Sequence, residues 1–258
     1  MTEALHAEWT KLRTAPGTVW LLLGVVAATV AVSVMATAAV ACPAGGCALD
    51  PAKVSLTGIQ LGQAVVAIVA VLAIGGEYGT GMIRVTLTAV PRRTHVLAAK
   101  AAVVTALVVP AATLAVLACL LAGRLILPGH GVTAGHGYPP LSLGDGPVLR
   151  AAAGSVLYLA LIALLSFGIA AAVRDSAAAI GIVLGVCYVL PILTQVVADP
   201  HWRRHLQQIG PVSAGLAIQA TTELPSLPIS PWAGLGVLAA WAAAALLTGG
   251  LLLRLRDA

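Results

Sequence analysis

The sequence contains very little charge. Only 9% of its 258 residues are Asp, Glu, Lys or Arg, whereas 60% are hydrophobic and the mean hydropathy is +1.01. Soluble globular domains carry roughly 25% charged residues, so this composition excludes an ordinary soluble domain. The net charge of +5 does not indicate nucleic-acid binding, because no soluble domain is left to present a basic face.

Residues that could carry catalysis are scarce as well. Only nine residues are Asp or Glu, and no pair of carboxylates falls within an apolar run. His201 and His205 stand four residues apart but lack the intervening Glu of a zinc-protease helix. His130 and His136 lie in a glycine-rich segment with Asp145 further on, where a metal site or proton relay stays open, and an intramembrane enzyme that uses His130, His136 or His201 is one minor alternative. We expect no catalytic residue, no metal and no cofactor.

An internal source of energy is also lacking. No phosphate-binding GxxxxGK(S/T) pattern occurs, and the central turns of the apolar runs hold no ionisable residue. Ion-coupled transporters usually place ionisable groups or broken polar helices near the middle of the membrane. If this protein moves a solute against a gradient, the driving force has to come from another subunit that binds a cytoplasmic surface of this chain.

What the chain has instead is a series of long uncharged runs. Each of them exceeds the roughly 20 residues that a helix needs to cross a hydrocarbon layer of about 30 Å. We therefore predict an all-α polytopic membrane protein in which residues 1–258 form one transmembrane domain. The six predicted spans cover residues 18–40, 56–75, 98–123, 151–173, 177–197 and 232–253.

The positive charges are distributed unevenly between the connections. With the N-terminus inside, nine of the 14 Lys and Arg residues fall on the cytoplasmic side. Cytoplasmic loops carry an excess of Lys and Arg, so both termini are predicted to be cytoplasmic. The connection between the fourth and fifth spans is only Arg174-Asp175-Ser176, which predicts a tight turn with Asp175 or Ser176 as the N-cap of the next helix.

Two segments near the N-terminus carry specific expectations. Leu5, Trp9 and Leu12 share one helical face, which suits a helix lying in the membrane interface and anchored by Trp9. A frayed tail with one Trp in the lipid is the alternative. Cys42 and Cys47 flank Pro-Ala-Gly-Gly in the first outer loop, where a disulfide and two free thiols are both open.

The last outer segment, Asp199–Pro231, is semi-apolar and too broken to cross a membrane. Backbone of this kind is tolerated at membrane depth only where protein shelters it, so we predict re-entrant or interfacial helices here. Trp202 and Trp232 flank the segment and are expected in the aromatic belt at the membrane surface.

Small and polar residues within the spans predict helix packing. The candidate packing positions are Thr29, Ser33 and Thr37 in the first span, Gly58 and Gly62 in the second, and Gly181 and Gly185 in the fifth. Pro110 and Pro191 are expected to kink their spans. Gln60 and Gln63 either line a path or sit in water at the outer end of the second span.

The longest polar stretch is GGEYGTGMIRVTLTAVPRRTHVLAAK, from Gly75 to Lys100. On a helical wheel its first part is amphipathic, with Glu77 and Arg84 on the polar side. Pro91 ends the helix, and Arg92 and Arg93 follow at the level of the lipid headgroups. Read alone, the stretch is also consistent with an ordinary positively charged loop.

This stretch resembles the loop between spans two and three in the membrane subunits of bacterial ATP-binding-cassette (ABC) exporters of the type 2 permease class. The matching residues are Glu77, Tyr78, Thr80, Gly81, Ile83, Arg84, Thr86, Leu87, Pro91 and Arg93. The resemblance extends to AEWTKLRT before the first span, GPVSAGLAI in the last outer segment and SPW before the sixth span. It implies six helices, an N-terminal interfacial helix and location in the bacterial cytoplasmic membrane.

The resemblance also implies a coupling helix that docks into a separate ATPase, in an assembly of two permeases and two ATPases. Its coupling surface would comprise Glu77, Tyr78, Thr80, Gly81, Arg84 and Thr88. The expected function is therefore the permease subunit of an exporter for a hydrophobic or amphipathic substrate, with ATP hydrolysis confined to the partner. The alternative is a membrane scaffold or immunity protein that binds a partner without transport.

Overall fold

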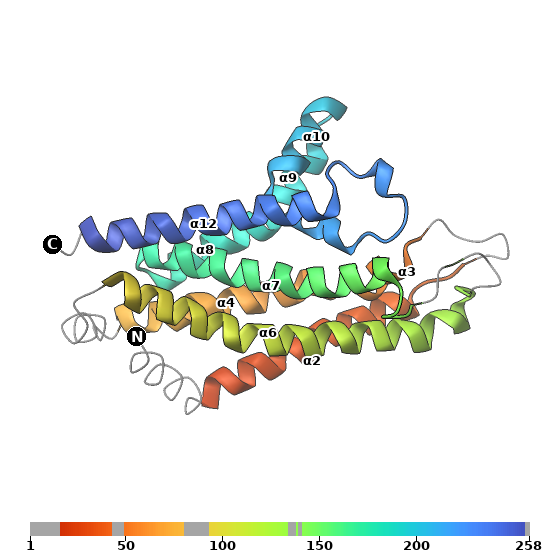
Figure 1. The fold of residues 1–258 in the computed structure, drawn as a ribbon, viewed down its shortest axis with the longest axis horizontal. Coiled ribbons are helices and arrows are strands. Elements are labelled where there is room, and N and C mark those ends of the chain that lie inside the picture. The colour runs from red at the N-terminus through yellow and green to blue at the C-terminus, as the bar shows by residue number, and fades with distance from the viewer. Residues whose placement is uncertain (1–15, 43–48, 80–92, 134–137, 139–140, 256–258) are drawn as a thin grey trace.

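The computed structural model describes residues 16–42, 49–79, 93–133, 138 and 141–255, and every regular element within them is a helix. Six helical segments are long and apolar enough to cross a membrane (Figure 1). They are α2 (Pro16–Ala38), α4 (Ile59–Gly79), α6 (Arg93–Ile126), α7 (Gly146–Val173), the run of α8 (Ser176–Leu184), the π-helix η3 (Gly185–Val189) and α9 (Leu190–Val196), and α12 (Pro231–Leu255). Six apolar helices indicate a multi-pass membrane protein, as the composition predicts.

Shorter helices lie in the connections. They are α3 (Pro51–Ser55), η1 (Leu127–His130), α10 (Pro200–Ile209), α11 (Pro211–Gly215), η4 (Leu216–Gln219) and η5 (Leu224–Ser226). In Figure 1 the bundle has two ends. We call the end where α2 begins and α12 finishes the termini end, and the opposite end, which carries α3 and η1, the α3 end.

Aspartate followed closely by proline begins several of these helices. Asp50 accepts hydrogen bonds from the backbone N–H groups of Ala52 and Lys53, and Asp199 accepts one from His201 N. A side-chain oxygen at the N-cap satisfies N–H groups that have no partner inside the helix, and proline in the first turn needs no such partner. Asp175 caps α8 through Ala178 N at 2.7 Å, which confirms one of the two predicted caps.

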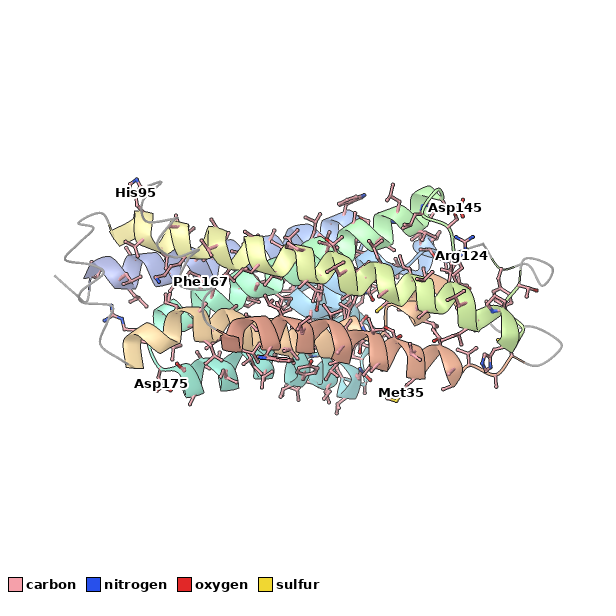
Figure 2. All side chains as sticks on the ribbon, turned by 90° about the horizontal axis from the view of Figure 1, so that it is seen from below. Met35, His95, Arg124, Asp145, Phe167 and Asp175 are labelled. Carbon is pink, nitrogen blue, oxygen red and sulfur yellow. The ribbon has the colours of Figure 1, made fainter. Side chains whose placement is uncertain are left out.

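The centre of the bundle is α7, which packs against α12, α4, α6 and α8, while α2 packs against α6 and α4. Tyr158 and Phe167 of α7 are completely buried, and Figure 2 shows Phe167 within the bundle between the long helices. By contrast, long apolar side chains such as Leu114, Val196 and Leu247 are mostly exposed on the outer surface. An apolar exterior around an apolar core is typical of helices that face lipid.

The helices α2 and α4 pack through the small residues predicted from the sequence. Thr29, Ser33 and Thr37 are fully buried, and Ser33 Oγ accepts a hydrogen bond from Gly58 N at 3.0 Å. A Cβ atom at Gly58 would lie 1.9 Å from the carbonyl oxygen of Thr29, and one at Gly62 would lie 2.3 Å from Thr29 Oγ1. Thr29 and Ser33 of α2 therefore form one interface with Gly62 of α4 and with Gly58, which directly precedes α4.

The glycine pair in the fifth span behaves differently. A Cβ atom at Gly181 or Gly185 would meet nothing within 4 Å. The prediction of a packing contact for these glycines is therefore wrong within this chain, since Gly181 of α8 is exposed and Gly185 of η3 meets no other group at its Cβ position. Only a narrow stripe of α8 and η3 is buried, at Ala179, Val183 and Cys187.

Candidate functional site

The predicted coupling segment connects α4 to α6 at the termini end of the bundle. Glu77 and Tyr78 lie in the last turn of α4, which continues to Gly79, and Arg93 begins α6. Thr80, Gly81, Arg84, Thr88 and Arg92 lie outside the described residues, as does Trp9. The structure therefore gives the helices that flank the segment.

The end of α4 contacts the turn between α7 and α8. A Cβ atom at Gly75 would lie 2.2 Å from Ser176 Oγ, so the two helices approach closely beside the coupling segment. Arg174 follows α7 with a left-handed backbone conformation, φ = 64°, which is common where helices end. Figure 2 shows Asp175 at the termini end, where α8 begins.

The same turn is attached to the end of α12. Arg174 donates a hydrogen bond from Nη2 to the carbonyl oxygen of Leu252 at 3.2 Å. Further along, a Cβ atom at Gly249 would lie 2.8 Å from the carbonyl oxygen of Gly168, so the backbones of α7 and α12 are in direct contact. The ends of α4, α7, α8 and α12 consequently form one connected junction at the termini end.

The fifth span contains its own bend point. Residues Gly185–Val189 form a π-helix, and Pro191 follows within the first turn of α9. Both features interrupt the regular ladder of α-helical hydrogen bonds. The kink expected at Pro191 stays a prediction, and the π-helix has no sequence signature that we recognise. Pro110 lies inside α6, which continues as one helix from Arg93 to Ile126.

The middle of the bundle holds a buried polar pair. The hydroxyl group of Tyr158 donates a hydrogen bond to Oε1 of Gln63, and both side chains are almost fully buried. Gln60 is exposed, and its carbonyl oxygen accepts from the hydroxyl of Tyr188 at 2.5 Å. The interpretation of Gln63 as wet is therefore wrong, because the side chain joins α4 to α7 inside the core.

Part of the segment 199–231 forms a wedge that we define as α11 and η4, residues 211–219. The wedge packs between α7 and α12. A Cβ atom at Gly215 would lie 2.8 Å from the ring of Tyr158, and one at Gly234 would lie 2.0 Å from the carbonyl oxygen of Ala214. Protein thus surrounds this segment as expected, while its re-entry into a membrane stays a prediction.

Polar contacts hold the far side of the wedge at the α3 end. Asp50 accepts hydrogen bonds from Thr221 N, from Thr221 Oγ1 at 2.6 Å and from Thr222 N at 3.1 Å. Together with its two N-cap bonds at α3, this carboxylate joins the connection between α2 and α4 to the connection between α9 and α12. Arg150 of α7 donates to the carbonyl oxygen of Ala220 at 2.5 Å. Sequence reasoning missed this group, although Asp50-Pro51 is a helix-start signal.

A second polar contact holds the wedge from inside. Gln219 Nε2 donates to Ser155 Oγ of α7 at 3.3 Å, and both residues are buried. A buried side chain with a partner costs far less than an unsatisfied one. The wedge is therefore positioned by polar contacts on two sides and by backbone packing on the third.

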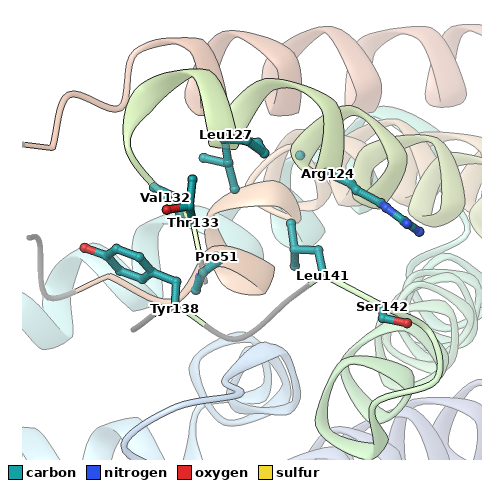
Figure 3. A pocket seen from close by; sticks show the side chains of 10 residues that line it. Pro51, Arg124, Leu127, Val132, Thr133, Tyr138, Leu141 and Ser142 are labelled. Carbon is teal, nitrogen blue, oxygen red and sulfur yellow. The ribbon is translucent and has the colours of Figure 1, made fainter. Parts of the chain in front are cut away.

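Beside α3 lies a cavity of about 310 Å³ (Figure 3). Pro51, Leu127 and Leu141 line its centre, and Tyr138 closes one side. In Figure 3 the guanidinium of Arg124 points away from these apolar side chains. The cavity therefore offers apolar walls and no charged group directed into it from the described residues.

The remaining predicted residues have the following positions. Trp202 and Trp232 are 63% and 58% exposed, in α10 and at the start of α12, which is compatible with the predicted belt but does not test it. Cys42 is disulfide-bonded, while Cys47 lies outside the described residues, so their pairing stays a prediction. The rings of His201 and His205 meet edge to face at 4.6 Å. Among the described residues no three metal-ligating side chains converge.

Searches of protein-family models and of curated proteins found no match to this chain. The functional interpretation therefore rests on the residues and on the arrangement described above. In that arrangement the described polar groups join helices to one another at both ends of the bundle and within its core.

Proposed function

We propose that this chain is the permease subunit of an ATP-driven ABC exporter in the bacterial cytoplasmic membrane, with both termini inside. Its cargo is a hydrophobic or amphipathic compound, and two copies work with two ATPase subunits. The observation that carries the proposal is the stretch GEYGTGMIRVTLTAVPRR at the junction between the second and third apolar helices. The helices that flank it, α4 and α6, have these ends where α2 begins and α12 finishes, which supports this proposal (Figure 1).

In this proposal the contacts at the junction transmit movement from the ATPases to the helices. ATP binding closes the two ATPases, and their movement displaces the coupling helix at Glu77–Thr88. Because α4 continues into that segment, α4 moves with it. The contact of Gly75 with Ser176 passes the displacement to the start of α8, and the packing of Gly58 on Thr29 passes it to α2.

In this proposal the α3 end of the bundle closes the transport pathway on the outer side of the membrane. The wedge of α11 and η4 stays with α7 and α12, to which it is packed, while the fifth span bends at η3 and Pro191. Access to the outside then depends on how far α8 and α9 separate from the rest of the bundle. Differential movement of this kind is what alternating access requires of a transporter.

The test is complex formation with an ABC ATPase encoded beside this chain. We expect the two proteins to purify together and the permease to stimulate ATP hydrolysis. The double variant Glu77→Arg with Arg84→Glu should abolish both effects, because the charges are reversed at both ends of the proposed contact. Arg124→Glu is the matched control, since Arg124 is exposed at the α3 end and should change neither effect.

The outcomes separate the proposal from its rival. An unchanged complex and unchanged ATP hydrolysis in the double variant would show that the coupling surface is elsewhere. Partner-dependent flux of an amphipathic probe into inverted vesicles supports an exporter. A stable complex without flux for any of a panel of lipids, drugs and peptides supports the scaffold alternative.

A further inference from the structure

The helix α10 differs from every other described helix longer than eight residues, because none of its residues is buried. Trp202, Leu206 and Ile209 fall at i, i+4 and i+7, which places them on one face. The opposite side carries Arg204 and two glutamines, and no acidic residue occurs between Pro200 and Ile209. In Figure 1 α10 projects from the bundle across the direction of the long helices, near the level where α12 begins.

An apolar cavity of about 240 Å³ lies beneath the apolar face of this helix. Leu206 and Ile209 form one wall, Leu190 and Pro191 of α9 form another, and Val212 and Trp241 close the rest. The cavity is smaller than the roughly 300–1,000 Å³ of pockets that enclose whole drug-sized ligands. Its size and lining suit part of an acyl chain.

The cavity is held in shape by hydrogen bonds around it. Trp241 donates from Nε1 to the carbonyl oxygen of Ile209 at 3.0 Å, which fixes the end of α10 to α12. Gln208 donates to the carbonyl oxygen of Pro228 at 2.7 Å. Arg203 donates twice to the carbonyl oxygen of Val197, at 3.1 and 3.2 Å, and so fixes the start of α10 to the end of α9.

The charges on α10, away from the cavity lining itself, favour an anion. Among the described residues Arg203 bonds only to a carbonyl oxygen, and Arg204 is exposed and makes no hydrogen bond or ion pair with any of them. The adjoining carboxylate, Asp199, is occupied as the N-cap of α10. A basic amphipathic helix lies in a membrane interface with its apolar face in the acyl region and its cations at the phosphates.

We propose that α10 and the cavity beneath it form a binding site for an anionic phospholipid of the bilayer. One acyl chain occupies the cavity against Leu206, Ile209 and Trp241, and the phosphate lies at the guanidinium groups of α10. The inference requires only that the chain sits in a bilayer, so it does not rest on the proposed transport function.

Tryptophan fluorescence tests the site directly, because Trp241 lines the cavity. The other four tryptophans are replaced by Phe, and the protein is reconstituted with phosphatidylcholine or phosphatidylglycerol that carries bromine on an acyl chain. We expect the brominated phosphatidylglycerol to quench Trp241 at a lower mole fraction than the brominated phosphatidylcholine. A variant that retains only Trp20, which is 73% exposed on α2, should be quenched equally by both lipids.

Arg204→Gln supplies the charge test, since this side chain has no described structural contact. One Arg near an anionic surface contributes about five-fold in affinity, so the preference for phosphatidylglycerol should fall by about that factor, and Arg204→Lys should keep it. Equal quenching of Trp241 by the two lipids, or a preference that Arg204→Gln leaves unchanged, overturns the proposal. No quenching by either lipid also overturns it and indicates that protein, such as a second copy of the chain, covers the cavity. Should Arg204→Gln fail to fold, the two-lipid comparison with Trp241 alone decides.

Discussion

Replacing Gly58 by Ala tests how α2 and α4 are held together. The added Cβ would lie 1.9 Å from the carbonyl oxygen of Thr29 and 2.6 Å from Ser33 Oγ. The serine hydroxyl can rotate, but the carbonyl belongs to the backbone of α2. Relief of the clash therefore requires the helices to separate until the contact reaches the 3.4 Å of ordinary van der Waals distance.

Two losses add up at this position. Overpacking of a tight interior costs about 1–3 kcal/mol. Separation also weakens the hydrogen bond from Gly58 N to Ser33 Oγ, and interhelical hydrogen bonds in membranes contribute on average about 0.6 kcal/mol. We expect the free energy of unfolding to fall by about 2–4 kcal/mol.

Unfolding by sodium dodecyl sulfate from mixed micelles, followed by circular dichroism, measures the change. Gly181→Ala is the matched control, because nothing lies within 4 Å of its Cβ position. An exposed Gly→Ala change inside a helix should leave stability unchanged or raise it by up to about 1 kcal/mol. If Gly58→Ala unfolds at the same detergent concentration as Gly181→Ala, the close contact between α2 and α4 does not exist.

Further predictions follow from the other contacts. Gly62→Ala should destabilise the protein by about 1–3 kcal/mol in the same assay. A second change, Thr29→Ala, should restore the stability of the Gly62→Ala variant but not that of the Gly58→Ala variant, because only the Gly62 clash is with the threonine side chain. Tyr158→Phe should lower the free energy of unfolding by about 1–2 kcal/mol, because Gln63 Oε1 loses its hydrogen-bond partner. Adding Gln63→Met should restore most of this loss, and an equal loss in the double variant would argue against the pair. Asp50→Ala should raise amide hydrogen exchange at Thr221 and Thr222 by at least about ten-fold, which is equivalent to one lost charge-assisted hydrogen bond. Asp145→Ala is the control, since Asp145 makes no side-chain cap bond. Unchanged exchange in Asp50→Ala would mean that the carboxylate does not hold this loop.

The sequence was sufficient to predict that the chain forms six long apolar helices, and where each of them approximately lies. Hydropathy reports the transfer of a helix into lipid directly, and this term does not depend on which helices are neighbours. The cap at Asp175 was predictable for a similar reason, because the oxygen and the N–H group that it bonds are three residues apart. Features whose physics is local were the ones that the pattern of residues could reveal.

The contacts that organise the bundle were not predictable. Gln63 and Tyr158 are 95 positions apart, and Asp50 and Thr221 are 171 apart, so each polar side chain had several possible partners. The glycine pairs show the same limit. Gly58 and Gly62 resemble Gly181 and Gly185 in spacing, but only the first pair meets another helix, because small residues permit close approach without specifying a partner.

The six spans are therefore not equivalent in how they are held. Small residues and hydrogen bonds fix α2 to α4, α4 to α7, and α7 to α12, and α11 and η4 are attached to α7 and α12 from within. The span formed by α8, η3 and α9 buries only Ala179, Val183, Cys187 and Thr194, although the Tyr188 hydroxyl also bonds to Gln60 of α4. It contains both a π-helix and a proline. Few buried contacts and broken helical hydrogen bonds mark the elements that open most easily. If a partner moves one part of this protein relative to the rest, we expect the span from α8 to α9 to move at η3 and Pro191, because the α-helical ladder is interrupted there. Its first residue, Ser176, lies against Gly75 of α4, the helix that leads into the predicted coupling segment.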